Sequence, residues 1–255
     1  MDTISRRIEE AHARSALYRY LSTLYVYPDS ASWQTLHESS PGDLERVLSV
    51  LGWSAKGSTR LPERLQAMTA EQFASEHVAI FGHTAAGELR PYEAGYGAHH
   101  VFQETQCLAD VCGFYGAFGL EPSETQRERP DHIAVELEFM HVLALKEAYA
   151  LLHEWGENAD LCTQAEIGFL RDHLGRWAPS FLKRLSDRSG GGIFELIADV
   201  TAACVKAHRQ TVGVDLGAND VEPAPASAEP EGTNFSCVAA CGAGMEESTG
   251  TEAAN

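Results

Sequence analysis

Hydrophobic residues recur along most of this chain at the three- and four-residue spacing of α-helices, and the strict alternation that marks β-strands is almost absent. Glycines, prolines and polar clusters divide the pattern into segments. We expect helices at residues 2–26, 30–38, 42–52, 62–81, 98–118, 131–155, 158–176, 179–187 and 191–211. The pattern therefore predicts an all-α fold, a compact multi-helix domain over residues 1–212.

The end of the chain differs from this domain in composition. Residues 213–255 are rich in Ala, Gly, Pro, Ser and Glu and have few large apolar side chains, so they lack the surface that a core requires. No Lys or Arg follows Arg209, whereas eight acidic residues follow Val214. We therefore expect a disordered acidic tail at 213–255. Its Cys237 and Cys241 could form a disulfide or bind a metal, but nothing nearby supplies the other two ligands of a tetrahedral site.

The helix expected at 131–155 begins with the most polar chemistry in the chain. Asp131 stands where an N-cap belongs, directly after Pro130, and we expect both Asp131 and His132 to be exposed there. The polar connection at 120–130 is longer than a usual link between helices and is a candidate functional loop. Apolar residues cover nearly the whole circumference of the helix, which predicts a central position in the fold.

The same helix raises the question of a metal site. Glu138 and His141 have the Glu-x-x-His spacing of half a di-iron carboxylate site. At about 100° per residue, however, His132 and Glu136 face one side of the helix, and Glu138 and His141 face nearly the opposite side. One metal ion cannot bind all four. A buried Glu136 or Glu138 would need a partner such as Arg or Tyr. A di-metal carboxylate enzyme using Glu138 and His141 is kept as the alternative function.

Charge and hydropathy exclude several classes of protein. The net charge of −18 would repel phosphate backbones, so we do not expect a nucleic-acid partner. No apolar run approaches the roughly 20 residues that a membrane span needs. Ser5-Arg6-Arg7 is followed by Glu9 and Glu10 rather than by the apolar segment of an export signal. These features predict a cytoplasmic protein without integral membrane association.

The cysteines and the missing catalytic motifs bear on the compartment and on the function of the protein. Six cysteines are spread without the framework of a secreted protein, so we expect a reducing compartment and free thiols in the helices. The chain has no Gly-x-Ser-x-Gly, no phosphate loop and no dinucleotide-binding glycine pattern. We therefore predict that it is not an enzyme and that it holds no cofactor.

Residues 108–148 combine several short motifs in a fixed order. They are Ala109-Asp110, Gly113-Phe114-Tyr115, Phe118-Gly119, Glu128-Arg129-Pro130-Asp131-His132 and Glu136-Leu137-Glu138-Phe139-Met140, with Pro91-Tyr92-Glu93 and Tyr96 upstream. With this combination in an all-α context, the chain resembles the TorD/DmsD/NarJ family of redox-enzyme maturation chaperones over about residues 10–210. It departs from the family pattern at His77, where an aromatic residue is usual.

The resemblance implies a cytoplasmic, system-specific chaperone. Members of the family bind the twin-arginine leader, or the apo form, of the catalytic subunit of a molybdopterin-containing oxidoreductase. They hold this partner until cofactor insertion is complete and then release it for export or assembly. An acidic body suits an arginine-bearing peptide, because complementary charge speeds and orients the encounter.

The resemblance also implies which residues contact the client, with Asp131 and His132 marking the leader-binding loop. The full set of candidates is Glu128, Pro130, Asp131, His132, Tyr92, Glu93, Tyr96, Phe118 and Gly119. Asp131 could accept a charge-assisted hydrogen bond from a leader arginine. If Asp131 instead caps its helix, His132 or Glu93 becomes the better candidate. The apolar part of a leader would need a groove near residues 92–102 or along the face that bears Phe114, Tyr115 and Phe118.

Overall fold

The computed structural model describes residues 2–82, 89–97, 101–121 and 128–215, with the backbone alone at 41 and 101–103. These described residues form ten α-helices and one short 3-10 helix, and they contain no β-strand. The all-α prediction is therefore confirmed. From residue 216 onward the predicted tail, with Cys237 and Cys241, lies outside the described residues.

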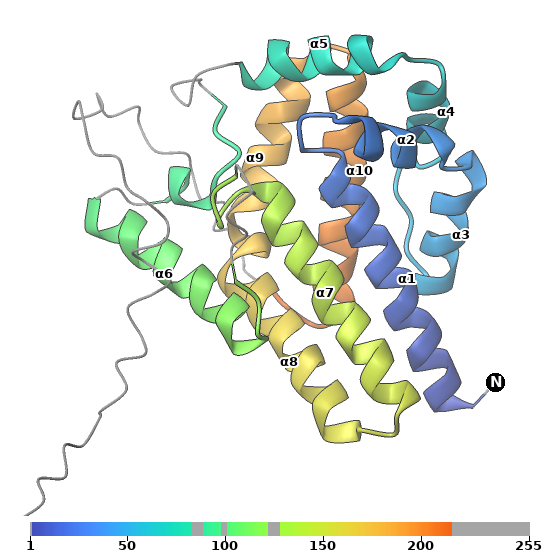
Figure 1. Ribbon diagram of the computed structural model, residues 1–255, viewed down its shortest axis with the longest axis vertical. Helices are drawn as coiled ribbons and strands as arrows, with labels where there is room; N and C mark the ends of the chain where they lie inside the picture. Colours follow the sequence, from blue (N-terminus) through green and yellow to red (C-terminus); the bar gives the residue numbers. More distant parts are fainter. Residues whose placement is uncertain (1, 83–88, 98–100, 122–127, 216–255) are drawn as a thin grey trace, which may run out of the picture.

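The helices form a bundle that is capped at one end (Figure 1). They are α1 (Thr3–Thr23), α2 (Ser30–Glu38), α3 (Pro41–Leu51), α4 (Arg60–Gln66), α5 (Ala70–Phe81), η1 (Glu93–Gly95), α6 (Val101–Ala117), α7 (Ile133–Leu152), α8 (Gly156–Asp172), α9 (Leu174–Ser189) and α10 (Ile193–Thr211). α1 packs along α7, α9 packs along α10, and α8 joins α7 to α9. α6 stands at the side of the bundle. Within the described part of the chain, no helix has the length and apolarity of a membrane span.

α7 is the central helix that the sequence predicts, although one of its faces is open. Twelve of its 20 residues are buried, as a helix with apolar side chains on most sides requires. Leu145, Tyr149 and Leu152, however, are 43%, 52% and 56% exposed. These positions recur at helical spacing, so they form a stripe on one face of α7. α7 is therefore packed on most sides, as expected, and this stripe is its open face.

The helix predicted at 62–81 is divided in the structure into α4 and α5. Thr69 begins α5 as its N-cap, and its hydroxyl accepts a hydrogen bond from the backbone N–H of Gln72 at 3.3 Å. In return, the Gln72 side chain accepts from the backbone N–H of Thr69 at 2.8 Å. This capping box satisfies two backbone donors at a helix start, which explains why the helix is interrupted here.

The helix break predicted between residues 176 and 179 is misplaced. In the structure the helix is interrupted at His173, between α8 and α9, and Pro179 lies inside α9. Gly175 explains this position, because a Cβ atom there would lie 2.1 Å from the carbonyl oxygen of Leu170. The two helices therefore approach each other so closely that only glycine fits.

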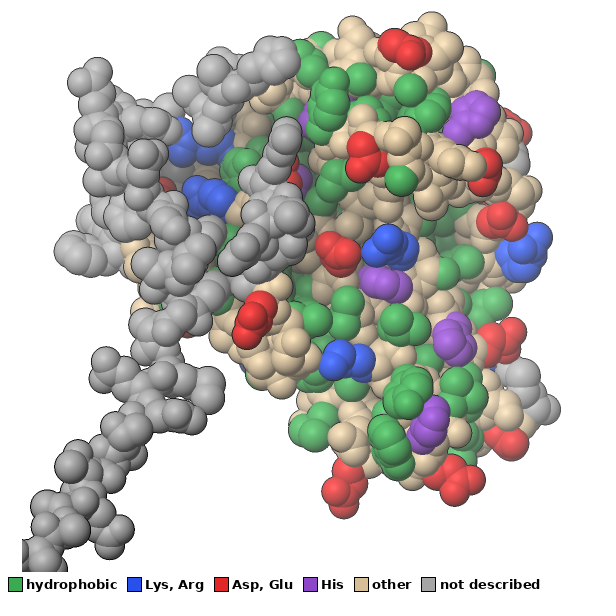
Figure 2. All heavy atoms as spheres, in the orientation of Figure 1, with side chains coloured by type: hydrophobic (Ala, Val, Ile, Leu, Met, Phe, Trp, Pro, Cys, Tyr) green, Lys and Arg blue, Asp and Glu red, His purple; other side chains and the backbone are tan. Residues whose placement is uncertain are grey.

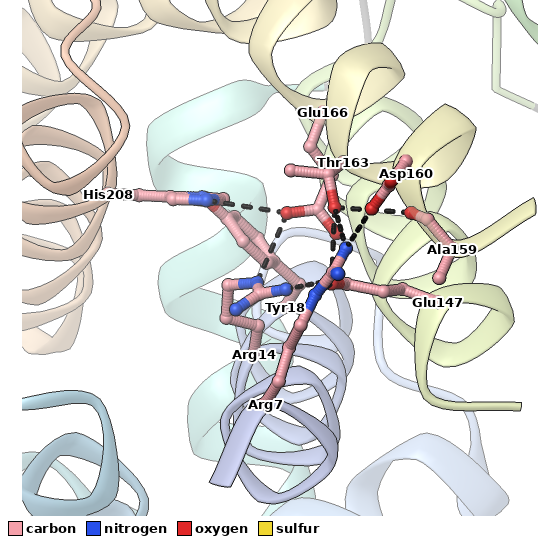
Figure 3. A network of polar contacts seen from close by, with 9 residues as sticks. All are labelled: Arg7, Arg14, Tyr18, Glu147, Ala159, Asp160, Thr163, Glu166 and His208. Carbon is pink, nitrogen blue, oxygen red and sulfur yellow. Dashed lines mark hydrogen bonds and ion pairs between the residues drawn. The ribbon is translucent and has the colours of Figure 1, made fainter. Parts of the chain in front are cut away.

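A buried network of charges joins α1 to α7, α8 and α10 (Figure 3). Arg14 pairs with both Glu147 and Glu166, and Arg7 pairs with Glu147 at 2.8 Å. Nε2 of His208, from α10, lies 3.4 Å from Glu166. The two glutamate side chains are only 2% exposed, so the guanidinium groups must offset the cost of removing them from water. The network thus sets the position of α1 against three other helices.

Candidate functional site

The segment at 91–96 meets the start of α7 through a short antiparallel contact. Tyr92 and His132 form an isolated β-bridge, beside which the backbone N–H of Glu93 donates to the carbonyl of Asp131 at 2.9 Å. Residues about 40 positions apart in the chain are therefore brought side by side. Most of the candidate client-binding residues lie in or next to this contact.

Asp131 is fully buried, so the expectation of an exposed N-cap is wrong. Its carboxylate accepts two hydrogen bonds from the Arg129 guanidinium, at 3.0 and 2.9 Å, and one from the backbone N–H of Ala94, at 3.1 Å. The same guanidinium lies over the Tyr92 ring, 5.0 Å from its centroid. A guanidinium offers a carboxylate two parallel donors, which makes it a stronger partner than a single backbone N–H. Asp131 therefore holds the 91–96 segment against α7.

His132 takes the N-cap position instead, and it is also buried rather than exposed. Its Nδ1 accepts a hydrogen bond from the backbone N–H of Ala134 at 3.2 Å, and the residue is 4% exposed. Burial lowers the pKa of His132 to about 3, and the positive fields of His77 and Arg129 act in the same direction. The ring is therefore neutral at physiological pH, which its role as an acceptor requires.

A second buried acidic cluster lies next to this contact. Both carboxyl oxygens of Glu136 accept from the indole Nε1 of Trp177, at 3.2 and 3.0 Å, where we had expected Arg or Tyr. Burial raises the pKa of Glu136 well above its usual range, and the neighbouring Glu93 carboxyl adds to this rise. Glu136 is therefore held in its neutral form and can donate a hydrogen bond to Glu93. Glu93 in turn lies 3.0 Å from Nδ1 of His173.

The two clusters support one wall of an open groove of about 870 Å³ between η1, α6 and the junction of α8 with α9. Aromatic and acidic side chains dominate its lining, namely Tyr96, Phe114, Trp177, Glu93, Glu104, Asp110 and Asp172. Arg176 is the single guanidinium among the lining residues that the structure describes. Hydrogen bonding to Arg171 holds the pKa of Asp172 below its usual range. The groove is therefore acidic beside an aromatic surface.

A smaller pocket of about 210 Å³ lies along the outer face of α7. Glu128 and Pro130 line this pocket, and the Tyr92 hydroxyl donates to the Glu128 carboxylate at 3.2 Å. Phe118 and Gly119 directly precede two of its lining residues in the chain. The structure thus separates the candidates. Glu93 and Tyr96 line the groove, Glu128 and Pro130 line the small pocket, and Asp131 and His132 are buried. Tyr92, Phe118 and Gly119 lie next to lining residues of the small pocket, through a hydrogen bond or in the chain.

Sequence reasoning missed the side of the groove that α8 and α9 supply. Asp172, His173, Arg176 and Trp177 line it, and none of them was a candidate. The four-residue spacing of His173 and Trp177 gives no usable signal, because the helix is interrupted at His173. The closely packed Gly175 between them prevents the helix from running straight through this region.

The aromatic residues of the helix at 98–118 that we expected to line a groove lie in different surroundings. Phe114 lines the groove, whereas Tyr115 is buried and its hydroxyl donates to the carbonyl of Pro130 at 2.8 Å. Phe118 packs against Phe139, with ring centroids 6.0 Å apart. The side chain of Phe102 lies outside the described residues. Among the described side chains of this set, Phe114 is the one that lines the groove.

His77, where the chain departs from the family pattern, occupies an aromatic position. Its ring packs against those of Phe81 and Phe194, with centroids 4.7 and 5.8 Å away, and meets the Tyr27 ring edge-on. Burial lowers the pKa of His77, which favours the neutral ring. The imidazole therefore packs as an aromatic side chain would.

The residues of the alternative metal site bind other groups. Glu138 pairs with Arg19 at 3.3 Å, and Nδ1 of His141 lies 2.9 Å from the Ser15 hydroxyl. The part of the chain that the structure describes contains no group of three or more His, Cys, Asp or Glu side chains that could hold a metal ion. The four described cysteines are free thiols, as expected.

Comparisons with known proteins find similarity to one family model and to several proteins named as chaperones. A family model described as the nitrate reductase delta subunit matches residues 42–183. The chain is 28% identical over 214 residues to the selenate reductase assembly chaperone protein of Thauera selenatis, covering 81% of this chain and 93% of that protein. It is 26% identical over 221 residues to the perchlorate reductase assembly chaperone protein of Dechloromonas aromatica, covering 84% and 96%. A TorD chaperone of Vibrio cholerae is 28% identical over 203 residues, covering 76% and 89%.

Proposed function

The chain belongs to the nitrate reductase delta subunit family of TorD-like proteins, and from this membership we propose that it is a maturation chaperone for a molybdopterin-containing oxidoreductase. It binds the twin-arginine leader of the catalytic subunit, the apo form of that subunit, or both. It acts in the cytoplasm, where it holds the subunit until the cofactor has been inserted, before export or assembly. Its role is binding rather than catalysis.

The acidic groove is the observation that carries this proposal. Four carboxyl groups and a single guanidinium line it beside three aromatic rings. Guanidinium groups bind carboxylates through two parallel hydrogen bonds and also stack on aromatic rings. The groove therefore offers both surfaces that the arginine pair of a leader requires.

The apolar part of a leader fits along α6. Ala109, Gly113 and Ala117 recur at four-residue intervals on the groove side of this helix. A Cβ atom added to Gly113 would meet no other heavy atom within 4 Å, so open space lies in front of it. Small side chains let a bound backbone approach closely, while the half-buried Phe114 supplies apolar contact.

The buried candidates act by positioning the groove. Asp131 and His132 hold the 91–96 segment in place, so that Glu93 and Tyr96 face the client. In this arrangement a leader arginine meets the exposed acids of α6 rather than Asp131, whose oxygens are already bonded. The residues around the smaller pocket, Tyr92, Glu128, Pro130, Phe118 and Gly119, provide a further contact with the client.

Isothermal titration with a synthetic twin-arginine leader tests the groove. The double variant Glu104→Gln and Asp110→Asn should weaken binding by about tenfold and reduce its dependence on salt, because it removes two exposed charges. The matched control is Glu9→Gln with Glu63→Gln, which removes two exposed acids from α1 and α4. Equal binding by the groove variant and the wild type would exclude this site.

Co-purification of the full-length chain from its native host tests the client class. We expect a molybdopterin-type catalytic subunit to be recovered with it and to be enriched in its apo form. The proposal fails if no such subunit is recovered and twin-arginine leaders also give no binding heat.

A further inference from the structure

Large apolar side chains stand exposed where α7 ends. Leu145, Tyr149, Leu152 and Trp155 are 43%, 52%, 56% and 50% exposed, and we call these four residues the α7 end surface. Figure 2 shows hydrophobic side chains gathered with histidine at the lower end of α7. Single exposed apolar residues are ordinary on a protein surface, but a contiguous group of them marks an interaction site.

Aromatic rings pack against one another at the α7 end surface. The rings of Tyr149, His153 and Trp155 form a cluster in which the centroids of His153 and Tyr149 lie 4.1 Å apart, those of His153 and Trp155 5.1 Å, and those of Tyr149 and Trp155 5.8 Å. The Trp155 backbone N–H donates to the carbonyl of Ala150 at 2.8 Å and turns the chain back on α7. A surface whose side chains are already ordered loses little conformational freedom when a partner binds.

The turn that places Trp155 contains an unusual backbone conformation. Glu154 has φ of 61°, the single positive φ outside glycine among the described residues. This region of φ is unfavourable for residues with a Cβ atom and is normally taken by glycine at the end of a helix. Strain of this kind persists only where the surrounding structure fixes the backbone, and it is often found at functional sites. Here it occurs directly before Trp155, at an exposed acidic residue.

The charges around the α7 end surface select its partner. Glu154 precedes Trp155 in the chain, Glu157 follows it, and both are exposed. Asp160 on α8 is already paired with Arg7 at 2.9 Å. A second copy of this chain would bring these glutamates against one another, and anionic lipid would be repelled in the same way. A helix with an apolar face bordered by Lys or Arg would be attracted.

The spacing of the surface also fits a helix. Leu145, Tyr149 and Leu152 follow the pattern i, i+4, i+7, which an amphipathic partner helix meets along its length. The same face of α7 continues toward the smaller pocket, where Val142 lies three residues before Leu145. That pocket includes Glu128 and Pro130, so the α7 end surface is continuous with the candidate client site.

From these observations we propose that the α7 end surface docks an amphipathic helix, bordered by basic residues, from the folded part of the client catalytic subunit. This proposal rests on the proposed function and adds to it a second contact, separate from the leader groove. The chaperone would then hold its client at two points, one on the leader and one on the body.

Two binding measurements on the full-length protein separate these contacts. The first uses the apo catalytic subunit without its leader, and the second uses the synthetic leader alone. The variant Tyr149→Ser with Leu152→Ser should weaken binding of the leaderless subunit by about tenfold and leave leader binding within about twofold. The matched control is Tyr27→Ser, which removes a 59% exposed tyrosine from the connection after α1.

The variant Glu154→Gly distinguishes the effect of the Glu154 charge on binding from any effect on the stability of the fold. Glycine relieves the positive φ, so the variant should melt at a higher temperature than the wild type. It should nevertheless bind the leaderless subunit less tightly, because a carboxylate is lost. A more stable variant with reduced binding cannot be explained by damage to the fold.

Four results would overturn the docking proposal. The first is that the leaderless subunit does not bind the wild type, and the second is that it binds the double variant equally well. The third is that the protein binds anionic vesicles through Trp155, and the fourth is that it forms a dimer that the double variant abolishes. Absence of leader binding by the wild type would instead count against the proposed function. The two failures are therefore distinguishable.

Discussion

Replacing Glu136 with Gln should stabilise this protein increasingly as the pH rises. Burial holds the pKa of Glu136 well above its ordinary value of 4.5, whereas in the unfolded chain the carboxyl ionises near that value. The fold favours the protonated form, so the stability that this group contributes below pH 4.5 is lost as the pH rises. The loss is about 1.4 kcal/mol per pH unit until the folded-state pKa is reached. Gln cannot ionise, and its amide oxygen can still accept from Trp177.

Urea denaturation followed by tryptophan fluorescence, from about pH 4 to about pH 8, measures this difference. The wild type and Glu136→Gln should differ little near the lower limit and diverge as the pH rises, with the variant more stable. His132 and the other titrating groups occur in both proteins and cancel in the comparison.

The control is Glu136→Ala, which leaves the buried indole N–H of Trp177 without a partner. Relative to Glu136→Gln, which also lacks the ionisable carboxyl, it should be less stable by about 1–3 kcal/mol at every pH. A difference between the wild type and Glu136→Gln that stays constant with pH, or that favours the wild type at high pH, would refute a protonated Glu136.

Three further predictions concern buried or partly buried polar groups. Asp131→Ala should lose about 1.5–3 kcal/mol in urea denaturation, because charge-assisted bonds to Arg129 are broken, and a loss no larger than that of a helix cap would contradict this role. His132→Asn keeps a capping acceptor and should flatten the fall in stability from about pH 6.5 to about pH 3, since the wild-type fold keeps this histidine neutral there. Glu76 accepts from the backbone N–H of Ile193 at the start of α10, so thermal melting should show that Glu76→Ala costs about 1 kcal/mol.

The sequence predicts the helices of this fold well because local patterns determine most of them. Capping residues and apolar periodicity place α2, α3 and α10 within one or two residues of their observed limits. The misplaced break near Pro179 shows where such rules fail. Proline is a strong local signal, yet the position of this break depends on the approach of Gly175 to Leu170. That contact belongs to the packing of two helices and leaves no mark in a periodic pattern.

In the candidate site, too, the sequence predicts what local motifs determine and misses what depends on tertiary contacts. The motif around Asp131 identifies the correct region, but a capping rule cannot anticipate that Arg129 and the N–H of Ala94 bind this carboxylate. Glu136 was expected to need a partner, and Trp177 supplies it from 41 residues away. The groove itself forms only when η1, α6 and the α8 to α9 junction come together, so its missed wall could be found only from the structure.

The buried charge network also bears on how the protein is made. The Tyr18 hydroxyl and Nδ1 of His208, which lie 2.8 Å apart at the edge of the network, are separated by 190 residues in the chain. At ordinary ribosomal speeds, this span takes roughly 10 to 40 s to synthesise. Arg7 and Arg14 of α1 meet their carboxylate partners once α8 has been made, but Tyr18 and Glu166 lack His208 until α10 follows. The last helix therefore completes a network that the earlier helices can only begin.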